Sequence, residues 1–170
     1  MYYTFNATDK GYIGKAFEMA VKDALKRKNA DRVSPCGMAD FRFHNRNYDT
    51  KQNGTVLKYS EFQGYVRGSN RVIYATHVAY DVIEQTADTI TISVNLAETD
   101  MFVLDKQDFV NFLFSIGCIK HNLERATVNV QTVYNYKKNA YHGKKGKIIE
   151  AWASENDLGD DIIGEILAGL

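Results

Sequence analysis

Hydrophobic and polar positions divide the first half of the chain into one helical segment and several short extended segments. From about Asp9 to Lys28 the apolar residues recur on one face of a helix, and Thr8 or Asp9 can cap its start. The polar segment 44–54 predicts a hairpin loop. Segments rich in aromatic and β-branched residues predict four strands, at about 39–43, 56–63, 71–78 and 89–94.

The second half of the chain predicts one further helix, two strands and a terminal helix. Asp105 can cap a helix that buries Phe109 and ends at Gly117. Segments 126–133 and 148–152 predict strands, and a basic and aromatic loop joins them. Residues 154–170 predict a short acidic helix with one apolar face.

This order of elements predicts an α+β fold with a central mixed β-sheet flanked by helices. The length suffices for one hydrophobic core, and no internal repeat or long linker divides it. We therefore expect a single domain over residues 1–153, followed by the acidic helix at 154–170.

The formal net charge is zero, but the acids are concentrated at the end of the chain. Residues 151–170 contain five Asp or Glu and no Lys or Arg, so the first 150 carry 21 bases against 16 acids, a charge of +5. A mildly basic body is compatible with a nucleic-acid partner. Cys36 and Cys118 form no closely spaced motif and no signal-peptide pattern is visible, which favours a reduced, cytoplasmic setting. No apolar run approaches the roughly 20 residues of a membrane span.

Acidic side chains recur where the first helix and two predicted strands would meet. Glu18 lies at the edge of the apolar stripe of the helix, and Asp40 lies opposite the Phe41 side of its strand. Glu61 and Gln63 are two residues apart and project to the same face of theirs. Carboxylate and amide oxygens are the ligands that Mg²⁺ prefers, although a polar sheet face has the same composition.

Four stretches together resemble the PD-(D/E)XK nuclease-like family, in its small phage and mobile-element form. They are 14–22, 39–42, 59–64 and the strand that ends at 72–75. The similarity would cover about residues 10–120. The resemblance implies a restriction-endonuclease-like core with the element order αβββαβ.

The resemblance also implies a set of site residues. Glu18, Asp40 and Glu61 would be the carboxylates that hold Mg²⁺ or Mn²⁺. Gln63 would occupy the place of the family's lysine, which is a departure from the motif because a neutral amide supplies no positive charge. Lys58 could substitute for that lysine only if a bulge turned it to the face of Glu61.

Basic and aromatic residues of the second half are candidates for contact with the DNA backbone. An exposed loop that contacts nothing would have the same composition. The candidate residues are Tyr136, Lys137, Lys138, Tyr141, Lys144, Lys145 and Lys147, with Arg67 from the first half.

Two functions remain open at this point. The first is a Mg²⁺-dependent DNA endonuclease or resolvase-like phosphodiesterase of phage or mobile-element origin. The second is a nuclease fold without catalysis that binds DNA or a protein, such as a phage inhibitor of host defence of the anti-restriction or anti-CRISPR type. In the second case the helix at 154–170 would dock on a partner, although it could equally pack on its own domain or form a homodimer.

Overall fold

The computed structural model describes residues 1–29, 33–34, 39–43, 46–58, 61, 65, 71–105, 108–109, 112 and 127–140. Within these ranges the chain has a mixed α+β fold. Its helices are α1 (Tyr12–Asn29) and α4 (Val130–Ala140). Its strands are β1 (Tyr2–Asn6), β2 (Val33–Ser34), β3 (Phe41–Phe43), β4 (Arg46–Gln52), β5 (Val56–Lys58), β6 (Arg71–His77), β7 (Tyr80–Gln85), β8 (Thr89–Val94), β9 (Asp100–Leu104) and β10 (Thr127–Asn129).

A five-stranded mixed sheet forms the centre of the described fold, in the order β2-β3-β4-β6-β9. The strands β2, β3 and β4 are antiparallel neighbours, β6 is parallel to β4, and β9 is antiparallel to β6. A parallel neighbour requires a crossover connection. The crossover from β4 to β6 contains β5 and two residues with helical backbone, Glu61 and Tyr65.

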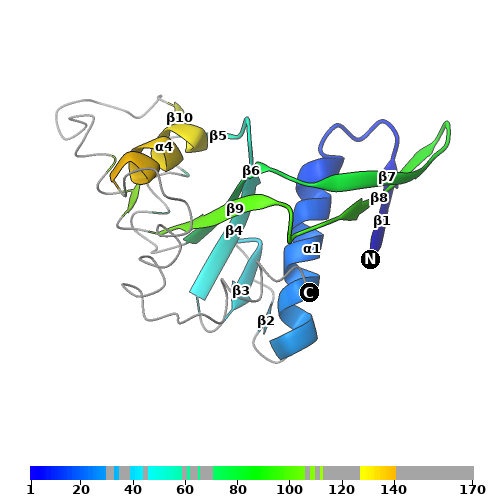
Figure 1. Ribbon diagram of the computed structural model, residues 1–170, viewed down its shortest axis with the longest axis horizontal. Helices are drawn as coiled ribbons and strands as arrows, with labels where there is room; N and C mark the ends of the chain where they lie inside the picture. Colours follow the sequence, from blue (N-terminus) through cyan, green and yellow to red (C-terminus); the bar gives the residue numbers. More distant parts are fainter. Residues whose placement is uncertain are drawn as a thin grey trace.

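Helix α1 packs between the central sheet and a second sheet, of order β1-β8-β7, as Figure 1 shows. Its apolar stripe buries Phe17, Val21 and Leu25 completely. These side chains belong to the same core cluster as Phe41 and Phe43 of β3. The helix therefore forms because one face is apolar at helical spacing and both sheets cover that face.

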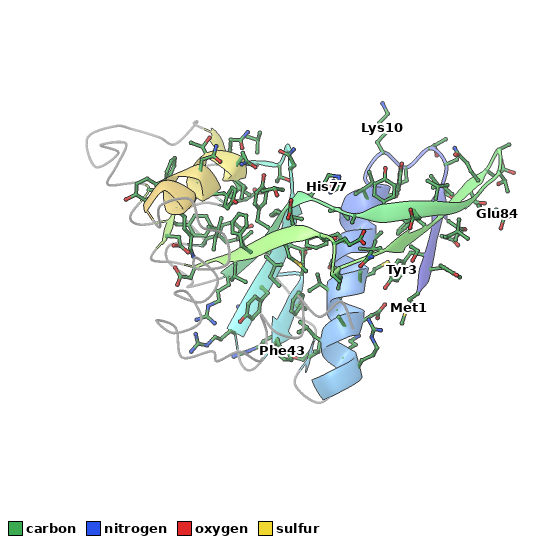
Figure 2. All side chains as sticks on the ribbon, in the orientation of Figure 1. Met1, Tyr3, Lys10, Phe43, His77 and Glu84 are labelled. Carbon is green, nitrogen blue, oxygen red and sulfur yellow. The ribbon has the colours of Figure 1, made fainter. Side chains whose placement is uncertain are left out.

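A second core lies beside β6 and β9, below α4 (Figure 1). Val72 and Tyr74 of β6 alternate with Ile73 and Ala75, which belong to the first core, because successive strand side chains point to opposite faces. The central sheet is thus buried on both faces at β6. Strand β8 contributes Ile90 and Ile92 to the first core, and the far end of the β7–β8 hairpin, near Glu84, extends away from the rest of the fold (Figure 2).

The structure confirms the predicted α+β class and the helix near the start of the chain. The strand predicted at 89–94 has the same bounds as β8, and the strand predicted at 71–78 corresponds to β6. Strands β7 and β9 were not predicted. The strand at 148–152 and the helix at 154–170 lie outside the described residues.

One predicted segment is wrong, and two predicted strands are confirmed only in their first part. The predicted loop at 44–54 contains β4. The predicted strand at 56–63 corresponds to β5 only as far as Lys58, and Glu61 has helical backbone. The predicted strand at 126–133 ends at Asn129, where α4 begins. Strand β4 was missed because Tyr48 is its one large apolar residue. That ring is fully buried and stacks on Phe41, with 5.5 Å between the ring centroids, so one aromatic anchor and pairing on both sides support an otherwise polar strand.

Candidate active site

One hydrogen bond joins Asp40 to Asp49 across the β3–β4 pair, and two more join Asp40 to the neighbouring Thr50. Phe41 and Tyr48 are Cα partners, so Asp40 and Asp49 occupy the next position of the antiparallel register. The amide of Asp40 donates to Asp49 Oδ1 at 3.0 Å. Asp40 Oδ2 accepts from the amide of Thr50 at 2.7 Å and from Thr50 Oγ1 at 3.0 Å. These bonds fix two carboxylates side by side at one end of the strand pair.

Lys51 follows on the same strand, two residues after Asp49. Residues two apart in a strand project to the same face, so Lys51 shares the face of Asp49. The ammonium group is near enough to lower the pKa of Asp49, although burial raises that pKa by more. Strand β4 therefore carries an acid-x-lysine pair, Asp49-Thr50-Lys51, that faces Asp40 across the β3–β4 pair.

The first half of α1 brings Glu18 to the same place. A Cβ at Gly14 would lie 3.3 Å from Gln52 Nε2, so the first turn of α1 runs close to the end of β4. Glu18 follows one turn later. Burial raises the pKa of Glu18, and the charges of Asp40 and Asp49 raise it further. Lys22 lowers that pKa across a 3.6 Å ion pair to Glu18 Oε1.

Tyr65 closes the cluster from the crossover between β4 and β6. Its buried side chain hydrogen-bonds the carboxylate of Asp49 and stacks on Phe109, with ring centroids 5.6 Å apart. Burial and the charge of Asp49 raise the pKa of this phenol well above its ordinary value. The hydroxyl therefore stays protonated at neutral pH and serves as a hydrogen-bond donor to Asp49.

The cluster is an accumulation of negative charge that its own lysines compensate only in part. Burial is the largest cause of the raised pKa of Asp49, and repulsion by Asp40 is the second. A bound cation would relieve that repulsion. Among the described residues, Asp40 Oδ2 accepts two hydrogen bonds, and Asp40 Oδ1 has no donor. The site therefore offers carboxylate oxygens that a cation could bind.

The donor set fits a hard divalent cation that takes few protein ligands. In the described part of the chain, no three His, Cys, Asp or Glu side chains form a group that could hold a metal ion by themselves. Mg²⁺ is commonly held by one or two carboxylates and takes its other ligands from water and substrate phosphates. Asp40 and Asp49 supply such a pair, and Mn²⁺ accepts the same oxygen ligands.

The predicted site residues do not all lie together in the structure. Glu18 lies near enough to Asp40 for the charge of Asp40 to raise the pKa of Glu18, and Asp49 of β4 is the carboxylate beside Asp40. Glu61 is exposed and helical, one turn before Tyr65, whose pKa its charge helps to raise. Lys58 lies in β5, which pairs with β10. Gln63 and Arg67 lie outside the described residues, as do Tyr141, Lys144, Lys145 and Lys147.

The predicted basic loop is a helix in its described part, and its first lysine is buried. Residues 134–140 belong to α4, which includes Lys138. Lys137 is 2% exposed; its ammonium group lies 2.8 Å from Asp108 Oδ2 and donates to the carbonyl of Val103 at 3.2 Å. Tyr136 packs edge-on against Phe112. Lys137 is therefore a core residue and cannot contact DNA in this conformation.

Asp108 belongs to a second acidic group that is internally paired. Asp105 Oδ1 accepts from the amide of Asp108 at 3.0 Å, and Asp108 Oδ2 accepts from the amide of Asp105 at 2.8 Å. This reciprocal arrangement is a capping box, and it supports the predicted helix start at Asp105. Burial raises the pKa of Asp108, and the charge of Lys137 lowers it.

The acid-x-lysine pair was present in the sequence and was missed. Asp49 and Lys51 have the spacing of the family motif, but they stand in a polar stretch that was assigned to a loop. Apolar alternation could not reveal β4. The motif spacing itself, tested at every acid that follows Asp40, would have found the pair.

Comparisons with protein-family models, with curated proteins and with solved structures find no match to this chain. Among the described residues, neither helix has the length and apolar character needed to cross a membrane.

Proposed function

We propose that the chain is a metal-dependent nuclease that hydrolyses phosphodiester bonds of DNA. The observation that carries the proposal is the pair Asp49-Thr50-Lys51 on β4, fixed beside Asp40 by hydrogen bonds and close to Glu18 of α1. The element order around it supports the proposal, because a helix, three antiparallel strands, a crossover and a parallel strand follow one another. The αβββαβ nuclease core has a helix in this crossover, where the described residues form β5 and include Glu61 and Tyr65 with helical backbone.

Each charged side chain of the cluster has a role in this proposal. Asp40 and Asp49 would hold Mg²⁺ or Mn²⁺. The chemistry that such an ion supplies when bound is charge stabilisation at the phosphate and a lowered pKa of a water molecule. The ammonium group of Lys51 donates a hydrogen bond to a phosphate oxygen and offsets the negative charge that develops there. Tyr65 holds the carboxylate of Asp49 in position.

Glu18 is suited to accept a proton. Its pKa is raised by burial and by the two neighbouring aspartates, which brings this carboxylate closer to neutral pH than an ordinary glutamate. A general base is most effective when its pKa lies near the working pH. Glu18 Oε1 faces Lys22, and the other oxygen, Oε2, is the one that would take the proton of the attacking water.

The lysine on β4 favours catalysis over the alternative of an inactive nuclease fold. The reason to consider an inactive site was the glutamine at position 63 in place of a lysine. With Asp49 and Lys51 as the motif pair, the site has its positive charge and that reason disappears. The inhibitor alternative also depended on the helix at 154–170, which lies outside the described residues.

The direct test is cleavage of DNA by the purified full chain. We expect Mg²⁺ or Mn²⁺ to support cleavage of single-stranded, duplex or branched DNA, and EDTA to abolish it. Asp40→Asn and Asp49→Asn should each lower the rate at least about 100-fold, the scale on which loss of a charge-stabilising group acts. DNA binding by both variants should remain.

A matched control separates the site from general charge effects. Asp88 is exposed at the turn of the β7–β8 hairpin, so Asp88→Asn changes the net charge equally and should cleave at the wild-type rate. Preparing all variants by the same protocol excludes a contaminating nuclease. Cleavage that is unchanged in Asp49→Asn, or absent from the wild type with every substrate and metal, would refute the proposal.

A further inference from the structure

The three-stranded sheet has two outer strands, and they differ in how well they are protected against pairing. In the order β1-β8-β7, the end strands β1 and β7 each have one hydrogen-bonding edge with no strand partner among the described residues. Such an edge can template pairing with another chain, and proteins commonly block it with charged side chains or a β-bulge. Strand β7 has both devices, and β1 has neither.

The protection of β7 is visible in its residues and its register. It carries Asp81 and Glu84, both exposed, and its register with β8 shifts between Val82 and Glu84. If two copies of β7 paired in antiparallel fashion about the Val82–Ile83 centre, Asp81 would lie opposite Glu84. Like charges in directly opposite positions are destabilising.

Strand β1 is uncharged and regular. Its sequence is Tyr-Tyr-Thr-Phe-Asn, and it pairs with β8 in one continuous register from Tyr2 to Asn6. In an antiparallel pair of two such strands with full overlap, Thr4 would lie opposite its own copy, and Tyr2 opposite Asn6. No charge would meet a like charge, so the strand is complementary to itself. A twofold dimer requires this property of its interface.

Exposed apolar side chains accompany the unprotected edge. Met1 and Tyr2 are each 66% exposed, and Met19 of α1 is 42% exposed. The hydroxyl of Tyr3 donates to Asp23 Oδ2 at 2.7 Å and lies 3.9 Å from the sulfur of Met1. Since Met19 is one helical turn from Asp23, it lies on the same side of α1. Figure 2 shows Met1 and Tyr3 together beside α1.

We propose that β1 pairs with β1 of a second copy of this chain. Antiparallel pairing would join the two three-stranded sheets into one continuous six-stranded sheet, and Met1, Tyr2 and Met19 would flank the junction. The partner is a second copy because the strand is self-complementary, uncharged and flanked by apolar side chains. This inference does not depend on the proposed nuclease activity.

The first test is the mass of the full chain in solution. Light scattering or sedimentation, from low to high micromolar concentration, should show a reversible monomer–dimer equilibrium for the wild type. Thr4 is exposed and its Oγ1 lies 2.9 Å from Thr91 Oγ1, so a longer side chain there can extend into solvent. Thr4→Lys should weaken the dimer about tenfold or more, because it places two ammonium groups opposite each other. Ile83→Lys on β7 should leave it unchanged.

A cross-linking experiment tests the register. Directly opposed residues of an antiparallel pair have Cα atoms about 4.5–5.5 Å apart, a separation that a disulfide can span. Thr4→Cys should therefore give a covalent dimer under mild oxidation. Val82→Cys on the protected edge should not, and the wild type reports any linkage through Cys36 and Cys118. Circular dichroism of each variant should match the wild type.

Three results would overturn the proposal. One is that the wild type stays monomeric at every concentration and that the Thr4→Cys variant forms no covalent dimer. Another is a dimer that Thr4→Lys leaves intact, which would place the interface elsewhere. The third is strong hydrogen-exchange protection, in the monomer, of the β1 amides that point away from β8. That result would mean that another segment of the same chain already pairs with this edge.

Discussion

Two groups of carboxylates in this protein are held in opposite ways. Asp105 and Asp108 bond to each other's amides, and Asp108 also pairs with a buried lysine at 2.8 Å. Asp40 and Asp49 also accept hydrogen bonds from backbone amides, but the charge of Asp40 raises the pKa of Asp49, and Lys51 lowers it by less. A buried lysine thus makes a close ion pair with one carboxylate of the first group, whereas neither aspartate of the second group has such a pair among the described residues.

Under the proposed function, the first group has a structural role and the second a catalytic one. A buried acid that pairs with a buried base can hold two segments together, and Lys137 does so between α4, β9 and Asp108. Raised carboxyl pKa values occur in both groups. Burial raises the pKa of Asp108 to about 7 even though Lys137 lowers it, and burial together with repulsion between carboxylates raises the pKa values of Glu18 and Asp49. Carboxylates with raised pKa values beside one another mark a candidate functional site, although structural ion pairs perturb pKa values as well.

The largest effect on stability should follow from breaking the ion pair between Lys137 and Asp108. Lys137→Met leaves the carboxylate of Asp108 buried without its partner, so the free energy of unfolding should fall by about 3–5 kcal/mol. Urea denaturation followed by circular dichroism measures this loss. The double variant Lys137→Met with Asp108→Leu removes both charges and should recover most of it. If the single variant is as stable as the wild type, the pair has no structural role.

Loss of the positive charge at the candidate site should act on the reaction and hardly on the fold. Lys51→Met should lower the rate of DNA cleavage by about 10²–10³-fold, because the ammonium group offsets charge that develops on the phosphate. Its side chain is only partly buried, so the free energy of unfolding should change by less than about 1 kcal/mol. Lys10→Met is the matched control, since Lys10 points away from the fold (Figure 2) and should cleave normally. Equal losses of activity in both variants would contradict the role given to Lys51.

The same contrast explains what the sequence could and could not predict. Helix α1 and strands β6 and β8 were found because their apolar residues follow the period of the element that they form. Asp40 and Glu18 became candidates because they border such apolar patterns. Strand β4 was missed, and with it Asp49 and Lys51, since its support is tertiary: the anchor Tyr48 and pairing with β3 and β6.

The helix of Lys137 was missed for a related reason. A lysine that is buried against Asp108, 29 residues away along the chain, cannot be told from an exposed lysine by composition. Its neighbours Tyr134 and Val133 pack into the second core, which includes strand β9, and β9 was itself not predicted. A prediction from local pattern therefore placed the basic segment on the surface.

Divalent cations should stabilise the protein, and more strongly at high pH. The folded-state pKa values of Glu18 and Asp49 are raised, so the folded protein binds more protons than the unfolded chain just above the ordinary carboxyl range. Without metal, the contribution of these groups to stability therefore falls as the pH rises through that range up to the raised pKa values. A cation binds the ionised carboxylates and should offset this loss, by about 1.4 kcal/mol at ten times its Kd.

Thermal unfolding with and without Mg²⁺ at pH 5 and pH 8 measures this effect. The gain in melting temperature should be larger at pH 8, and Asp49→Asn should remove most of it. The variant should also show a shallower fall of stability with pH in the absence of metal, because one of the repelling groups no longer ionises. Asp108 is present in both proteins, so its own titration cancels in the comparison. A Mg²⁺ effect that is the same at both pH values would argue against binding by these carboxylates.

The smallest expected effect concerns the one ion pair that the candidate site does make on α1. Lys22 and Glu18 are 3.6 Å apart at helical spacing, and both are about 30% exposed (31% and 28%). Solvent screens such pairs, so Lys22→Gln should lower the free energy of unfolding by only about 0.3–0.5 kcal/mol. In a Glu18→Gln background the same change should have no effect, which a double-mutant cycle measures. A coupling several times larger would mean that Lys22 neutralises the acidic cluster as Lys137 neutralises Asp108, and the contrast between the two groups of carboxylates would be lost.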